Sequence, residues 1–191
     1  INYDWWDYMK RVSLKPLEVS DAGEVYELCR GTFREEYHIT EERILESLFE
    51  DPDFSAEESK KIVDEKNGRM IGFIGVKVSH NEQLYPASAW ISIFAVKKEE
   101  QGKGYGTMVL NQVCQSLHKN GINKIYVGQD FNNFFSGIPD PDEGKEIFFK
   151  KNGFTLNRDR HFDLEADITD NRLIDSFDTS SFDKEFTGTT A

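Results

Sequence analysis

Short apolar segments bounded by turn residues predict a series of β-strands along the chain. Residues 60–65 and 69–79 form two such segments. Lys66-Asn67-Gly68 lies between them, and Asn-Gly in this position is typical of a β-hairpin. Residues 87–96 (ASAWISIFAV) are almost continuously apolar, which predicts a strand buried on both faces. The same reasoning predicts further strands at residues 14–19, 123–128, 154–156 and 161–168.

Apolar residues at helical spacing predict four helices. The first begins after Asp21, which has the spacing of a capping box with Glu24. The second begins at Thr40, the third runs through residues 107–121 to a stop at Gly121, and the fourth ends at Asn152-Gly153. The apolar faces of the second and third are Ile44, Leu45 and Leu48, and Val109, Val113 and Leu117. The order β-α-α-β-β-β-α-β-α-β-β indicates one mixed α/β domain.

Composition narrows the class of protein. The chain has 191 residues, of which 38% are hydrophobic, too many for a disordered chain. No stretch approaches the roughly 20 apolar residues of a membrane span, so we expect no membrane partner. Two distant cysteines, Cys29 and Cys114, exclude a disulfide scaffold and favour a reducing, cytoplasmic location. The four histidines are scattered and no CxxC or HxxxH pair occurs, so we expect no metal site.

The charge balance is acidic, with a net charge of −12. Such a surface repels a polyanion, so we expect no nucleic-acid partner, whereas a cationic small molecule or a basic peptide is tolerated. The acids are concentrated near the C-terminus, where residues 171–191 form an acidic tail or linker. Solubility alone also explains a charge of this size.

The segment Gln101-Gly102-Lys103-Gly104-Tyr105-Gly106-Thr107 joins the buried strand to the third helix. Glycines let the backbone approach a ligand closely, and a helix N-terminus offers free N–H groups, so the segment suits a phosphate or pyrophosphate. The Walker pattern fails because position 97 is Lys, and the dinucleotide fingerprint fails because Thr107 replaces its last glycine. The remaining pattern is QxxGxG after a hairpin strand; an ordinary strand-to-helix turn is the alternative reading.

This segment resembles the acyl-coenzyme A signature of the GNAT N-acetyltransferase superfamily. A second match is residues 146–154 (EIFFKKNGF), which are similar to the later helix-to-strand motif of that family. The resemblance implies a mixed α/β (α+β) fold. Its mostly antiparallel central sheet is splayed between the fourth and fifth strands and flanked by helices. It covers residues 13–170, with an N-terminal extension at 1–12. It also implies acetyl-CoA as co-substrate and a small-molecule or peptide amine as acceptor; a homodimer is compatible with the sequence.

The resemblance assigns coenzyme-binding roles to two groups of residues. Backbone N–H groups of the glycine-rich segment hold the pyrophosphate while Gln101 braces the loop, and the strand presents its backbone to the pantetheine arm. A backbone N–H near Phe94 or Ala95 would then stabilise the oxyanion. The residues implied are Ile93, Phe94, Val96, Gln101, Gly102, Lys103, Gly104, Gly106, Thr107 and Phe149.

Two departures from the family pattern leave the acid and base chemistry unassigned. Many members carry Tyr at the position of Phe149, where it protonates the leaving thiolate, and Glu at the position of Ser92. Neither group is present here. Ser92, Tyr126 and Asp130 are candidates for relaying the proton that the acceptor amine must lose, and packing roles are the alternative for each.

The loop FFSGIP, residues 134–139, resembles an FFPGIP-like loop found in a subset of the superfamily that includes tandem-domain proteins. On that reading the chain is the first half of a longer protein and its tail is a linker; an ordinary turn is the alternative. Two other functions remain open beside the N-acetyltransferase. One is a non-catalytic acyl-CoA-binding module, and the other is a nucleotide-binding protein.

Overall fold

The computed structural model describes residues 11–138 and 143–156. They form a mixed α/β fold around a five-stranded sheet, as the resemblance implies. The strands are β1 (Val12–Pro16), β2 (Lys60–Asp64), β3 (Met70–Val78), β4 (Ser88–Val96) and β5 (Lys124–Val127), in that spatial order. Neighbouring strands from β1 to β4 are antiparallel, whereas β4 and β5 are parallel.

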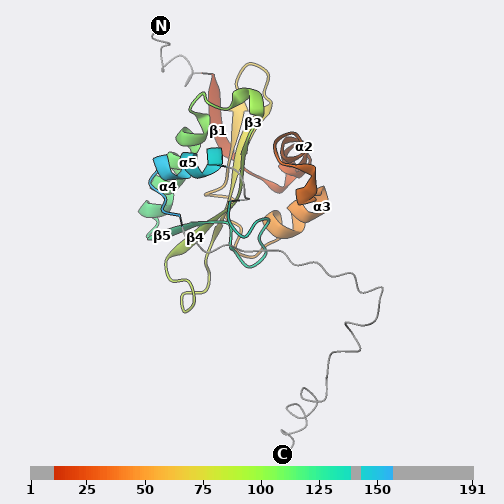
Figure 1. Cartoon of the computed structure of the whole chain (residues 1–191). Helices are drawn as coiled ribbons and strands as arrows, with labels where there is room; N and C mark the ends of the chain where they lie inside the picture. Colours follow the sequence, from red (N-terminus) through yellow and green to blue (C-terminus); the bar gives the residue numbers. More distant parts are fainter. Residues whose placement is uncertain (1–10, 139–142, 157–191) are drawn as a thin grey trace, which may run out of the picture. The chain divides into compact units, whose positions relative to one another are not determined.

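Helices cover both faces of the sheet (Figure 1). On one face lie α2 (Ala22–Thr32) and α3 (Glu41–Ile44), and α3 continues into a π-helical turn, η3 (Leu45–Phe49). On the other face lie α4 (Tyr105–Lys119) and α5 (Glu143–Lys151). Short 3-10 turns complete the description at η1 (Val19–Asp21), η2 (Glu35–Tyr37) and η4 (Lys98–Glu100).

The central strands contribute side chains to the hydrophobic core on both faces of the sheet, because successive side chains of a strand point to opposite faces. Phe73 of β3 points into the core under α2 and α3, whereas its neighbour Ile74 points into the core under α4 and α5. Both side chains are fully buried. The predicted hairpin at Lys66-Asn67-Gly68 is confirmed, since β2 and β3 pair in antiparallel register and Gly68 has a φ of 69°.

One local prediction was wrong, and one predicted strand is present with different bounds. Asp21 does not form a capping box with Glu24: its carboxylate accepts from the backbone N–H of Glu18 and pairs with Lys61, while Glu24 accepts from the N–H of Met70. The predicted strand at 14–19 is instead β1, which ends at Pro16 before the chain turns at η1. The spacing of Asp21 and Glu24 in the sequence does not show that Asp21 will pair with Lys61 of β2, or that Glu24 will accept a hydrogen bond from Met70 of β3.

The end of the predicted element order is only partly described. Residues 154–156 form no strand; the N–H of Phe154 instead donates to the carbonyl of Phe149 at 3.0 Å and closes the end of α5. Their predicted partner, residues 161–168, lies outside the described residues, as do most of the N-terminal extension and the acidic tail. Within the described part of the chain, no helix is both long enough and apolar enough to cross a membrane.

Candidate functional site

The glycine-rich segment forms a loop that leads directly into α4. Gly102 and Gly104 have φ values of 75° and 87°, which L-residues other than glycine rarely adopt. The side chain of Gln101 donates to the carbonyl of Val96 at 2.9 Å and so ties the loop to the end of β4. A Cβ added at Gly102 would meet no atom within 4 Å, which means that this side of the loop is open.

The N-terminus of α4 favours an anion. Its fifteen residues give a substantial helix dipole, and its first turn carries no acidic side chain to compensate that dipole. The ammonium of Lys103, in the same loop, pairs with Glu100 at 2.9 Å. The positive character of this end therefore comes mainly from backbone N–H groups.

The strands β4 and β5 separate halfway along β4. Their last register pair is Ile91 with Val127, and the N–H of Gly128 still donates to the carbonyl of Ile91 at 2.9 Å. Beyond this point β5 has ended, whereas β4 continues to Val96. The predicted splay between the fourth and fifth strands is therefore present, and within residues 11–138 and 143–156 no strand pairs with this edge of β4 beyond Ile91.

The splay begins where β4 carries one residue more than its other neighbour, β3. Gly75 pairs with Ile93 and the next residue, Val76, pairs with Ile91, so Ser92 is left without a register partner. A bulge of this kind redirects side chains and backbone groups of one strand. Ser92 is 2% exposed, and its Oγ has no hydrogen-bond partner.

A hollow of about 40 Å³ lies at the splay. It exceeds the space that one buried water requires and is far smaller than a drug-sized site. Residues of β4, the end of β5, the loop that follows, α5 and the end of α2 contribute to it. The lining residues are Phe33, Ile91, Ser92, Ile93, Phe94, Val127, Gly128, Phe135, Gly137, Ile138, Lys145 and Phe149.

The loop after β5 is held tightly against the splay. Gly128 has a φ of 65°, and a Cβ added there would lie 2.4 Å from the carbonyl oxygen of Phe135, so only glycine fits this position. The ring of Phe135 packs against Phe33 and Tyr37 at centroid distances of 5.3 and 5.2 Å. Phe135, Gly137 and Ile138 of the FFSGIP loop thereby form one wall of the hollow.

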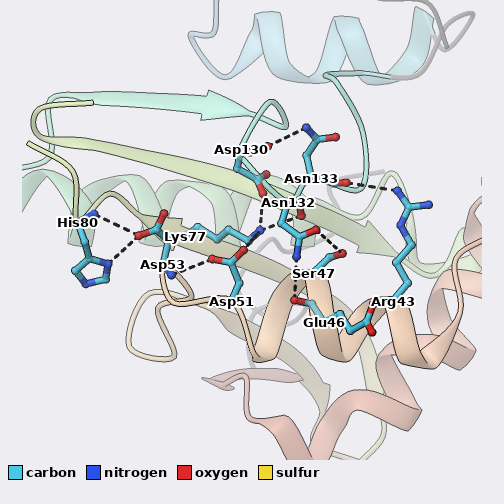
Figure 2. A network of polar contacts seen from close by, with 10 residues as sticks. All are labelled: Arg43, Glu46, Ser47, Asp51, Asp53, Lys77, His80, Asp130, Asn132 and Asn133. Atoms are coloured by element: carbon cyan, nitrogen blue, oxygen red, sulfur yellow. Dashed lines mark hydrogen bonds and ion pairs between the residues drawn. The ribbon is translucent and has the colours of Figure 1, made fainter. Parts of the chain in front are cut away.

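An ion cluster of Lys77, Asp51 and Asp130 holds the same loop against the rest of the fold (Figure 2). Lys77 of β3 is 1% exposed, and its Nζ lies 3.0 Å from Asp51 Oδ2 and 2.5 Å from Asp130 Oδ1. It also donates to the carbonyl of Asn132 at 3.1 Å. One ammonium thus joins the segment after η3 to the loop after β5.

Further polar contacts extend this cluster in both directions (Figure 2). Asn132 bonds to Ser47 at 3.3 Å, and Arg43 of α3 donates to the carbonyl of Phe134 at 3.3 Å. At the other end His80 contacts Asp53 at 2.8 Å. The loop that walls the hollow is therefore fixed by side chains of α3, η3 and β3.

The three candidate proton-relay residues occupy different environments. Only Ser92 lines the hollow. Tyr126 stacks on Trp90 with ring centroids 6.2 Å apart, and Asp130 is held by Lys77 in the buried ion cluster. Sequence reasoning missed both Lys77 and Lys145. Lys77 is marked by being the one charge within an apolar strand, and Lys145 by lying four residues before Phe149 on a helix.

Neither cysteine of the chain is placed to act as a nucleophile in this site. Neither cysteine lines the hollow, and burial raises the pKa of the Cys29 thiol to about 12. Burial also raises the pKa of Cys114. Among the described residues, no cluster of three or more His, Cys, Asp or Glu could hold a metal ion.

Comparison with known proteins identifies the family. The sequence model of the acetyltransferase (GNAT) family matches residues 22–136, which is more than half of the chain. The chain therefore belongs to the GNAT acetyltransferase family. No curated protein sequence matches it.

Solved structures share the fold at low sequence identity. A GCN5-related glucosamine N-acetyltransferase region of a fungal multi-domain β-N-acetylglucosaminidase matches with a TM-score of 0.69 and 20% identity, over 78% of this chain. The chain spans only 17% of that protein's length. An aminoglycoside acetyltransferase from an uncultured soil metagenomic sample, in complex with sisomicin, matches with a TM-score of 0.59 and 18% identity, over 83% of this chain and 99% of that one. The PaiA N-acetyltransferase of Thermoplasma acidophilum, in complex with coenzyme A, matches with a TM-score of 0.58 and 18% identity, over 78% and 92%.

Proposed function

We propose that this chain transfers an acetyl group from acetyl-CoA to a primary amine of a small molecule or peptide, by direct attack of the amine on the thioester. The observation that carries the proposal is the splay of β4 from β5, with Ser92 at its origin and a glycine-rich anion loop at the far end of β4. Membership of an acetyltransferase family supports the same reaction type.

The described residues fit coenzyme A in three respects. The open side of Gly102 and the N-terminus of α4 suit a pyrophosphate. The edge of β4 from Ile93 to Val96 offers backbone groups to the amides of a pantetheine arm, as a sheet edge does to a peptide. The small hollow suits a short acyl group better than a long one.

Catalysis in this proposal depends mainly on positioning. Bringing the amine and the thioester together in the hollow removes much of the entropic barrier. A backbone N–H of Phe94 or Ala95 would stabilise the oxyanion that forms on the thioester carbonyl. The Ser92 Oγ, which is buried without a partner, would hold the water that accepts the proton of the amine.

The charge of the chain favours a cationic acceptor. A net charge of −12 attracts polyamines and basic peptides and raises their rate of encounter. A structural neighbour bound to sisomicin, an aminoglycoside, shows that this fold accommodates such an acceptor in another protein. We therefore propose aminoglycosides, polyamines and lysine-containing peptides as the first acceptors to screen.

Calorimetric titration of acetyl-CoA, with ATP as the control ligand, tests the coenzyme site. We expect micromolar binding of acetyl-CoA and none of ATP. Binding of ATP but not acetyl-CoA would support a nucleotide-binding protein instead. Absence of both would remove the transferase proposal for this chain.

Release of free CoA thiol with a panel of amines then tests turnover. The alternative function is a non-catalytic acyl-CoA-binding module, or half of a two-domain protein, and it is motivated by Phe149 and Ser92 standing where many members have Tyr and Glu. That alternative predicts acetyl-CoA binding with no thiol release for any amine. An amine-dependent release above the rate of hydrolysis would exclude it.

A further inference from the structure

Lys145 brings a positive charge to the wall of the hollow. It lies in α5, four residues before Phe149, so the two side chains share one helical face, and both line the hollow. Among the described residues that line the hollow, Lys145 is the only charged one. Ser92 Oγ contributes a buried hydroxyl without a hydrogen-bond partner, and most of the remaining wall is apolar.

The ammonium of Lys145 is held at this position by an aromatic ring. Its Nζ lies 5.3 Å from the centroid of Phe33, which is a cation–π distance. Phe33 lines the same hollow and packs against Phe135, which fixes the ring. In a small hollow with mostly apolar walls, a charge acts on a nearby ion more strongly than it does in water.

The proposed reaction creates an anion that such a charge can stabilise. A bond forms between the amine nitrogen and the acetyl carbon, the carbon–sulfur bond breaks, and its electron pair leaves on sulfur as a thiolate. The amine nitrogen loses one proton in the same transfer, and the water held by Ser92 Oγ accepts it. Phe149 has no proton or charge to offer the sulfur. A cation beside the sulfur attracts the negative charge that develops on it.

We propose that Lys145 is a catalytic residue whose ammonium contacts the sulfur of coenzyme A and stabilises the thiolate as it leaves. This inference rests on the proposed function, because it requires the thioester to lie in the hollow. In this proposal the leaving thiolate is stabilised by Lys145, one helical turn before Phe149 in α5. It also gives Phe33 the role of a positioning residue that holds the ammonium.

Ionisation of the CoA thiol on the protein tests this without an acceptor. A thiolate absorbs in the far ultraviolet and a thiol does not, so the absorbance of the CoA complex can be followed against pH. The complex with acetyl-CoA, which has no free thiol, is the blank, and it also subtracts the protein's own cysteines and tyrosines. Calorimetry at pH 6, where the thiol of free CoA is protonated, shows whether each variant binds CoA.

We expect the thiol of bound CoA to ionise about 1–3 pH units below that of free CoA, because a cation lies within contact distance. Lys145→Met keeps the length of the side chain and removes its charge, so it should abolish the shift while CoA still binds. Lys145→Arg keeps the charge and should retain most of the shift. Lys150→Met is the matched control: this lysine is exposed on the same helix and pairs with Glu146 at 3.4 Å, so the shift should be unchanged.

Three results would overturn the proposal, and they can be distinguished from one another. If Lys145→Met binds CoA and the thiol ionises as in the unaltered protein, the ammonium does not contact the sulfur and the proposed function stands without it. If the unaltered protein does not bind CoA in the calorimeter, the proposed function fails and the role of Lys145 fails with it. Acetylation of Lys145 itself, seen as a mass gain of one acetyl group, would show that it is a nucleophile and would also contradict the proposal.

Discussion

Gly104 and Gly121 flank α4 with nearly the same positive φ, 87° and 84°. Gly104 precedes the first turn and belongs to the glycine-rich loop, whereas Gly121 follows the last turn. A Cβ added at Gly121 would meet no atom within 4 Å. Substituting alanine at each glycine therefore distinguishes two effects. Both variants strain the backbone, but only the one at Gly104 alters the proposed anion site.

We expect Gly104→Ala and Gly121→Ala to lower the free energy of unfolding by a similar amount, about 1–2 kcal/mol, because both force alanine into the left-handed region. Urea denaturation measures this. Only Gly104→Ala should weaken acetyl-CoA binding, by about tenfold or more in Kd, which corresponds to about 1.4 kcal/mol. Equal affinities for the two variants would show that the loop does not hold the coenzyme.

Two further glycines show how packing decides the effect of one methyl group. A Cβ added at Gly75 of β3 would lie 2.8 Å from Leu48 and 3.1 Å from Ile93, in a fully packed core. At Gly31, in α2, it would meet nothing within 4 Å. We expect Gly75→Ala to destabilise by about 1–3 kcal/mol through overpacking. Gly31→Ala should stabilise by about 0.5–1 kcal/mol through helix propensity. Thermal unfolding that moves both variants in the same direction would contradict this assignment.

At the scale of elements, Lys77 joins β3 to the loops that follow η3 and β5. Asp130 is buried and the side chain of Asp51 is only 9% exposed, so removal of the ammonium leaves two poorly solvated carboxylates without their shared partner. Breaking a buried ion pair from one side is far more costly than breaking an exposed one.

Lys77→Met is expected to lower the free energy of unfolding by about 3–5 kcal/mol, measured by urea denaturation. Lys150→Met removes an exposed ion pair from α5 and should change it by about 0.5 kcal/mol or less. The triple variant Lys77→Met, Asp51→Leu, Asp130→Leu should recover most of the loss, since no buried charge then remains. A triple variant as unstable as the single one would show that the cluster stabilises the fold by more than charge compensation.

Elements with local signals could be predicted from the sequence, and contacts between distant elements could not. The hairpin at Asn67-Gly68, the stop of α4 at Gly121 and the end of α5 at Asn152-Gly153 follow from turn and helix-end residues. The glycine-rich loop was found for the same reason. The resemblance to a family supplied the splay of β4 from β5.

The register slip at Ser92 carries no local signal, and the local signal at Lys77 does not identify its partners. The slip exists only as a difference between the pairings of two strands. Lys77 and Asp130 are 53 positions apart, and an isolated lysine in an apolar strand does not reveal which carboxylate it meets. The strand predicted at 154–156 is absent because three residues give too short a pattern to distinguish a strand from the closing turn of a helix.

At the scale of the whole molecule, the buried thiol of Cys29 makes stability depend on pH in the alkaline range. Its pKa is about 12 in the fold and 9.0 in a free chain. Between these values the folded chain keeps a proton that the unfolded chain loses, so the free energy of unfolding falls as pH rises above 9 and is unaffected by this group below it.

We expect the urea midpoint to fall between pH 9 and pH 11, and to fall less in Cys29→Ala, which has no thiol to ionise. Ellman's reagent offers a second reading, because only the thiolate reacts. At pH 8 Cys29 should react slowly in the native protein and rapidly in urea. Fast reaction in the native state would mean that the core under α2 opens often.

The shared ammonium of Lys77 also limits how this chain can be recombined with its relatives. A loop exchange that moves residues 128–138 alone into another GNAT sheet would carry Asp130 without Lys77, and so would bury an unpaired carboxylate in the host. The three segments around Asp51, Lys77 and Asp130 therefore form one unit of exchange, although they are far apart in the sequence. Chimeras designed to give this chain a new acceptor preference should be cut outside that unit, and chimeras cut within it should be recovered mainly as insoluble protein.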